Sequence, residues 1–135
     1  MKQIFLYLSF LLISLTLVSC DVATENSITF QNNADYGVTV NFRAQSIDVP
    51  AGNTVKLTKI DRGEYTYETV YDVPTGATSS EASDNLSGTF TIKAGTKILV
   101  IYSSVFDESS IYYIYASISS SDDLTANEIV NPIGP

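Results

Sequence analysis

The sequence predicts an all-β protein, a single antiparallel β-sandwich of about seven to eight short strands, with a small β-barrel as the alternative. Three observations predict this fold class. Apolar and polar residues alternate with period two through most of the chain after residue 26, turn residues separate the alternating runs, and no long segment combines helical spacing with a cap.

The alternating runs occupy residues 27–31, 37–43, 46–50, 53–60, 64–73, 88–93, 96–105 and 111–119. In the second run Val38, Val40 and Phe42 share one side, which is typical of a half-buried strand. Residues 98–102, ILVIY, are apolar on both sides and predict a central strand. Gly52 and Gly95 each follow an alanine just before a run, so they predict tight, hairpin-like turns.

Two segments lack the alternation. The connection 74–85, PTGATSSEASDN, is polar and longer than a sandwich needs, which predicts a loop without regular structure. The end of the chain, 120–135, predicts a polar tail in which Ile129 and Val130 could add one edge strand before Pro132.

The first nineteen residues predict an export signal. Lys2 precedes a continuous apolar stretch from Ile4 to Val18, and the small residue Ser19 follows it. The stretch is shorter than the roughly 20 residues that a spanning helix needs, and no basic stop-transfer residues come after it. A cleaved signal is therefore favoured over a transmembrane helix.

The residues Leu17-Val18-Ser19-Cys20 resemble the lipobox of bacterial lipoproteins. The resemblance implies that Cys20 carries a diacylglyceryl group and that the chain is cut between Ser19 and Cys20. It also implies an exported protein, anchored by lipid to a bacterial membrane on the periplasmic or cell-surface side. The alternatives are an ordinary export signal or a free thiol, since a lone cysteine has no disulfide partner within the chain.

The chain then divides into four parts: the signal peptide 1–19, the lipidated N-terminus and tether 20–26, the β-sandwich domain 27–119, and the polar tail 120–135. Removal of the signal leaves 116 residues, enough for one modest core. A six-residue tether reaches about 20 Å at most and would hold the domain close to the bilayer.

The charge balance excludes some partners. Loss of Lys2 leaves six basic against fifteen acidic side chains, a formal charge of −9. Such a chain cannot neutralise a phosphate backbone, so nucleic acid is not expected as a partner. The same balance argues against a basic surface for anionic lipid head groups, so attachment would rest on the acyl chains.

Residues 57–68, LTKIDRGEYTYE, carry a second resemblance. Leu57, Ile60, Gly63, Tyr65 and Tyr67 resemble the corner of immunoglobulin-like and transthyretin-like sandwiches. In such corners the tyrosine ring fills the end of the core and its hydroxyl reaches the backbone. The resemblance implies architecture only, because these folds support many functions.

The residue types of most catalytic sites are missing. The chain has no histidine, which removes the usual general base, the nucleophilic triads and most zinc sites. Glu68 and Asp72 lie about 13 Å apart along one predicted strand, near Glu64, which is too far for a glycosidase pair. The acids in predicted loops, Asp107, Glu108, Asp122 and Asp123, lack the spacing of a calcium loop. We therefore expect no enzyme, cofactor or metal, with a small carboxylate-dependent hydrolase as the alternative.

Tyrosine is the enriched aromatic residue, nine in all. In residues 111–119 one face carries Tyr112, Ile114, Ala116 and Ile118, so Tyr113 and Tyr115 point the other way. Tyr113 and Tyr115 are the candidate contacts for a protein or glycan partner, with cross-strand packing as the alternative role. The sequence thus predicts a lipid-anchored cell-envelope protein that serves as a non-enzymatic binding or structural module, with a carbohydrate-binding accessory module as a further alternative.

Overall fold

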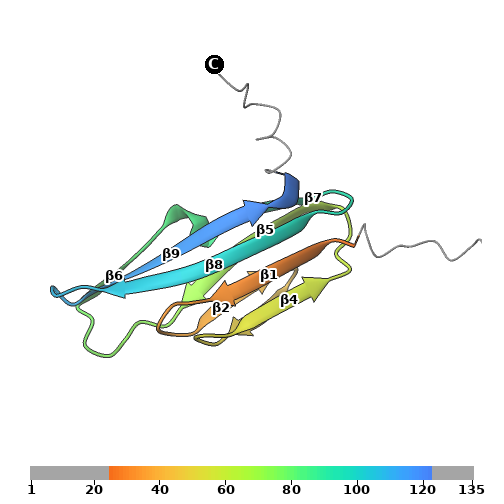
Figure 1. The fold of residues 1–135 in the computed structure, drawn as a ribbon. Coiled ribbons are helices and arrows are strands. Elements are labelled where there is room, and N and C mark those ends of the chain that lie inside the picture. The colour runs from red at the N-terminus through yellow and green to blue at the C-terminus, as the bar shows by residue number, and fades with distance from the viewer. Residues whose placement is uncertain (1–24, 123–135) are drawn as a thin grey trace, which may run out of the picture.

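The computed structural model describes residues 25–122, which form a two-layer β-sandwich (Figure 1). Its nine strands are β1 (Ser27–Asn32), β2 (Val38–Phe42), β3 (Gln45–Val49), β4 (Thr54–Thr58), β5 (Gly63–Tyr71), β6 (Ser79–Ala82), β7 (Ser87–Ile92), β8 (Lys97–Phe106) and β9 (Ile111–Ser120). A short 3-10 helix, η3 (Asp84–Leu86), precedes β7. The all-β sandwich predicted from the alternation is confirmed.

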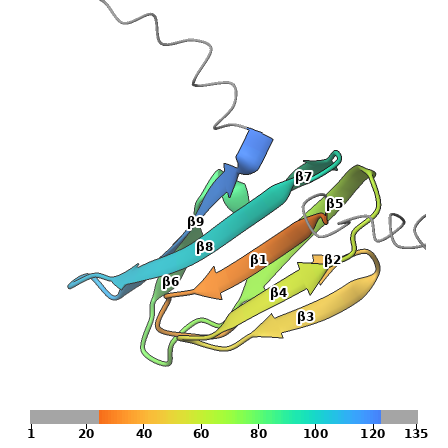
Figure 2. The same ribbon diagram turned by 45° about the vertical axis from the view of Figure 1, so that its right-hand side comes forward.

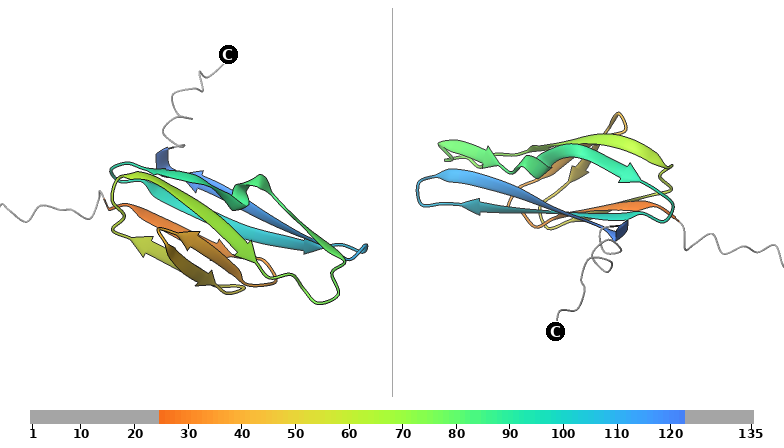
Figure 3. Two further views of the ribbon diagram at one scale, coloured as in Figure 1. Left: turned by 180° about the vertical axis from the view of Figure 1, so that it is seen from behind. Right: turned by 90° about the horizontal axis from the view of Figure 1, so that it is seen from above.

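The strands form two sheets that face each other (Figure 3, right). The larger sheet has the order β4-β1-β8-β9-β6 and the smaller sheet the order β3-β2-β5-β7. Most neighbouring strands are antiparallel, but β1 runs parallel to β8, and β6 runs parallel to β9. These parallel pairs join segments far apart in the sequence, which short-range patterns do not reveal.

The prediction of a loop over residues 74–85 is wrong for the middle of this segment. Ser79–Ala82 forms the edge strand β6, paired in parallel with the first residues of β9. All four of its residues are exposed, so burial imposed no alternation for the sequence to show. A short, polar edge with Glu81 is one of the ways in which sheets avoid pairing with other chains.

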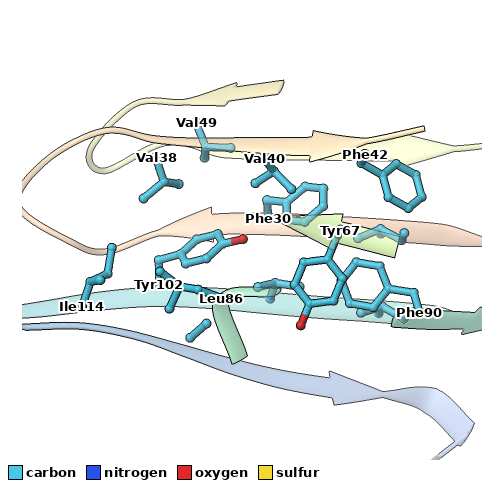
Figure 4. Packing of buried hydrophobic residues seen from close by; sticks show 14 of the residues in the cluster. Phe30, Val38, Val40, Phe42, Val49, Tyr67, Leu86, Phe90, Tyr102 and Ile114 are labelled. Carbon is cyan, nitrogen blue, oxygen red and sulfur yellow. The ribbon is translucent and has the colours of Figure 1, made fainter. Parts of the chain in front are cut away.

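The core lies between the inward faces of the two sheets (Figure 4). Phe30 of β1 is fully buried and lies beside Val40 and Phe42 of β2 in the core, and Val100 of β8 is fully buried as well. Burial of each such side chain stabilises the fold by about 1.5–3 kcal/mol. The alternation read in residues 37–43 is therefore the pattern of one core-facing strand.

Gly52 and Gly95 do close tight turns, since their φ angles are +77° and +76°. The turns are not hairpins, however. Gly52 lies between β3 and β4, and Gly95 lies between β7 and β8, so each turn carries the chain from the smaller sheet to the larger one. The glycine conformation reverses the chain direction, and tertiary packing decides whether the next strand joins the same sheet.

The sandwich has two distinct ends (Figure 2). At the N-terminal end β1, β5 and β8 begin and β4 and β7 end; at the far end lie the β8–β9 turn and the loop between β1 and β2. Asn26, the last residue of the predicted tether, is buried at the N-terminal end. Its side chain donates to the Ile60 carbonyl at 2.8 Å and accepts from the Thr96 amide at 3.0 Å. The domain thus holds the chain from residue 26 onward.

Candidate functional site

Strand β9 places Tyr113 and Tyr115 on the outer face of the larger sheet, as the alternation predicts. Tyr112, Ile114 and Ala116 on its other face are buried in the core. Tyr115 remains 44% exposed and Tyr113 is half-buried. Their outward orientation is therefore confirmed, whereas a role in binding stays a prediction.

The two outer rings lie side by side and nearly parallel. Their centroids are 6.4 Å apart, with 13° between the ring planes. Partial burial raises the pKa of the Tyr113 hydroxyl, and the nearby carboxylates of Glu81 and Asp107 raise it further. The raised pKa keeps the Tyr113 hydroxyl protonated at neutral pH, where it can donate and accept hydrogen bonds.

Neighbouring strands extend this outer face with apolar side chains. Val105 of β8 pairs with Tyr113 and is 53% exposed, and Ser103 pairs with Tyr115. Glu81 of β6 pairs with Tyr113 from the other side, so part of the segment 74–85 adjoins the tyrosines. We call Val105, Tyr113 and Tyr115 the tyrosine face.

Other exposed apolar side chains gather toward the far end. Tyr36 precedes β2, Val73 follows β5, and Phe106 is the last residue of β8, and each of the three is more than two-fifths exposed. Sequence reasoning missed this grouping because the three residues come from separate loops and strand ends. These three side chains are separate from the tyrosine face, because Phe106 pairs with the buried Tyr112 and Val73 follows a strand of the smaller sheet.

The remaining tyrosines have structural contacts. The Tyr65 hydroxyl donates to the Asp61 carbonyl at 2.9 Å, which is the contact that the predicted corner implies, and the Arg43 guanidinium lies 5.6 Å from the Tyr65 ring centre. Tyr67 stacks on Phe90 with ring centres 4.0 Å apart, and its hydroxyl donates to the Asn85 carbonyl. These rings close the core and are unavailable to a partner.

Two buried tyrosines differ in how their hydroxyls are satisfied. The Tyr102 hydroxyl shares a 2.8 Å hydrogen bond with Thr69, and burial raises the pKa of Tyr102 to about 12. Within residues 25–122 no group forms a hydrogen bond of good geometry with the Tyr112 hydroxyl. Burial raises the pKa of this hydroxyl, and the nearby Ser104 side chain lowers it by a smaller amount. The Tyr112 ring is fixed by the edges and faces of Tyr36 and Tyr71, at 5.9 and 6.2 Å.

The candidate carboxylates do not converge. Glu64 and Glu68 lie exposed on the outer face of β5, and Asp72 follows the end of that strand. Asp107 accepts a hydrogen bond from the Ile111 amide at 2.8 Å, which closes the β8–β9 turn. Within residues 25–122 no group of acids or thiols is arranged to hold a metal ion.

The smaller sheet's outer face offers only a shallow site. A hollow of about 250 Å³ lies between Asn41, Arg43, Thr66 and Glu68. Its lining is mostly polar and presents no paired carboxylates, nucleophile or oxyanion site within reach of one another.

Two hollows lie at the N-terminal end. One, of about 330 Å³, opens between the sheets beside Phe90, Lys93 and Asp122, where the Asp122 carboxylate accepts from the Thr96 hydroxyl at 3.1 Å. The other, of about 440 Å³, lies on the outer face of the larger sheet between Lys56 and Lys97. Sequence reasoning missed the second hollow because the two lysines come from strands that β1 separates.

The predicted lipidation and cleavage residues, Cys20 and Ser19, lie outside the described residues, as do Asp123, Ile129 and Val130. Among residues 25–122 no helix is long and apolar enough to cross a membrane. No protein-family model matches this chain, and no curated protein matches it.

Proposed function

We propose that this protein is an exported lipoprotein, anchored through Cys20, whose sandwich acts as a non-enzymatic binding module. The tyrosine face is its contact surface. The single observation that carries the proposal is the pair of parallel outer rings beside an exposed valine, on a face that the core does not use.

Three properties suit the tyrosine face to binding. Parallel tyrosine rings bury a large area at low cost in side-chain entropy, and their hydroxyls still form hydrogen bonds at the rim of a contact. The sheet beneath them is rigid, because Ile98–Phe106 of β8 pairs with Tyr112–Ser120 of β9 along its whole length. Along β8 the face begins about 20 Å beyond Lys97, so a tethered domain would present it away from its anchor.

A protein partner suits this surface better than a glycan does. Val105, which is 53% exposed, pairs with Tyr113, so aliphatic carbon lies beside the two rings, with Ser103 and Glu81 at their edges. Sites that bind sugars need several polar groups aimed at hydroxyls, whereas the centres of protein interfaces are apolar and aromatic. We therefore place the partner among the proteins of the cell envelope.

The anchor is tested by metabolic labelling. Cells that produce the wild-type chain should incorporate a radioactive fatty acid into the protein, and the mature N-terminus should be Cys20. The variant Cys20→Ser should lose the label and leave the membrane fraction. A fully soluble wild-type protein with a different N-terminus would end the lipoprotein proposal.

The contact surface is tested by photo-crosslinking in the producing cells. With benzoylphenylalanine in place of Tyr115, one discrete adduct is expected, and mass spectrometry of the adduct separates a peptide partner from a glycan. The matched control places the same photoreactive residue at Thr66, which is exposed on the outer face of the smaller sheet. Equal adducts from both positions, or none from Tyr115, would exclude the tyrosine face as the contact surface.

A further inference from the structure

The basic residues of this acidic protein are confined to one half of the domain. Within residues 25–122 they all lie in the half that holds the N-terminal end: Arg43, Lys56, Lys59, Arg62, Lys93 and Lys97. Four carboxylates share this end: Glu25, Asp61, Glu64 and Asp122. The far end has Asp35, Asp72, Asp107 and Glu108 and no described basic residue. Although the mature chain is expected to carry a formal charge of −9, its basic residues are therefore concentrated in one half of the domain.

Lys56 and Lys97 converge on one hollow. Lys56 of β4 pairs with Thr29 of β1, and Lys97 of β8 pairs with Ser27 of the same strand. Two strand spacings across and two residues along the sheet put their Cα atoms about 12 Å apart. All of these side chains line the hollow of about 440 Å³. Both ammonium groups can therefore reach a single anion held above β1.

The lining of the hollow suits an anion that carries apolar chains. No carboxylate lines it, whereas the hydroxyls of Ser27, Thr29 and Ser119 do. Leu99 and the methylene stems of the lysines add apolar surface, which a free inorganic anion would not use. Cationic heads above apolar stems are the usual arrangement of residues that lie in the head-group region of a membrane.

The position of the hollow selects the membrane as its partner. Ser27 lines the hollow and is also the residue at which the described sheet begins. Only the six residues 21–26 lie between it and Cys20, so the hollow lies within about 25 Å of the anchor proposed above. An anionic surface attracts each nearby lysine, and tethering turns this attraction into a preferred orientation of the domain.

We propose that the Lys56–Lys97 hollow binds the phosphate of an anionic lipid head group and docks the N-terminal end of the sandwich on the membrane. This inference rests on the proposed lipoprotein function. Docking would hold the N-terminal end at the bilayer and leave the acidic far end farthest from it; the tyrosine face lies on the same outer face as the hollow, toward that far end. It revises the expectation from net charge that the protein has no basic surface for lipids.

The test uses the chain from Cys20 to Pro135, coupled through its one cysteine to a maleimide lipid in vesicles. An amine-reactive reagent then labels the lysines, and mass spectrometry reads each site. On vesicles with phosphatidylglycerol, Lys56 and Lys97 should label about threefold or more slowly than on neutral phosphatidylcholine vesicles, and high salt should remove the difference. Lys93, which follows β7 and does not line this hollow, should be slowed less than Lys56 and Lys97.

Matched variants isolate the hollow. Lys97→Gln should return Lys56 to its labelling rate on neutral vesicles, whereas Lys93→Gln, an equal change in charge outside the hollow, should leave Lys56 protected. Equal protection of Lys93, or no dependence on phosphatidylglycerol, would overturn the proposal. Protection of Lys56 and Lys97 on neutral vesicles by inorganic phosphate alone would overturn it too, by making free phosphate the ligand.

This design separates the inference from the proposal on which it rests. The maleimide link supplies the anchor whether or not the cell acylates Cys20. Loss of fatty-acid labelling in cells would therefore contradict the lipoprotein proposal, and loss of lysine protection on vesicles would contradict the lipid-binding hollow.

Discussion

The inner and outer faces of the β8–β9 pair contain similar residues in opposite settings. On the inner face Tyr102, Tyr112 and Ile114 have no exposed surface. On the outer face Val105 and Tyr115 are about half exposed. Successive side chains of a strand point to opposite faces. The face to which a tyrosine points, and not the residue type, therefore decides whether it stabilises the fold or is free for a partner.

The largest expected effect comes from Ile114→Ala on the inner face. Ile114 is fully buried, so truncation leaves a cavity and should lower the free energy of unfolding by about 2–5 kcal/mol. Urea denaturation followed by circular dichroism measures this change. The outer-face control Tyr115→Ala should cost less than about 1 kcal/mol. Equal losses from the two variants would erase the contrast between the faces.

The second prediction concerns alkaline pH. Tyr102 must be neutral in the core, and its pKa rises from 10.0 to about 12 on folding. A raised folded-state pKa gives stability that is complete below pH 10 and is lost as pH rises toward 12, here by about 2–3 kcal/mol. Unfolding free energies measured between pH 9 and pH 12 should show this loss.

The control for the pH prediction is the variant Tyr102→Phe. It should show a smaller loss between pH 10 and 12, because the buried hydroxyl with the raised pKa is gone. If Tyr102→Phe retains the full loss, the alkaline sensitivity arises elsewhere.

The third prediction concerns the unpartnered Tyr112 hydroxyl. Because this buried hydroxyl has no hydrogen-bond partner within residues 25–122, Tyr112→Phe removes a desolvation cost while it keeps the ring. We expect the free energy of unfolding to stay constant or rise by about 1 kcal/mol, measured by urea denaturation. A fall of similar size would mean that the hydroxyl does have a partner.

Sequence reasoning predicted the features that follow from local alternation. The core side of β2 and the outward direction of Tyr113 and Tyr115 follow from period two, because each strand has one buried face. The edge strand β6 could not be found this way, because Ser79–Ala82 is exposed on both faces. Pairing order was equally hidden, since the parallel contact of β1 with β8 depends on packing between segments distant in sequence.

The same limit explains the outcome for the sites. The tyrosine face lies mostly on one strand and could be read from residues 111–119. The Lys56–Lys97 hollow needs the order β4-β1-β8, so no short motif marks it. The net charge of the chain argued against a basic surface, because a sum of charges does not show where the lysines lie.

We propose that the outer side chains of the β8–β9 pair contribute little to folding and instead contact a binding partner. The most direct measurement uses benzoylphenylalanine in place of Val105, with and without Tyr113→Ala and Tyr115→Ala together. With both tyrosines replaced, we expect the amount of crosslinked adduct to fall about tenfold or more, because each lost tyrosine contributes about 1–2 kcal/mol or more to binding. The melting temperature should change little. An unchanged adduct, or a domain unfolded by the two substitutions, would contradict the claim.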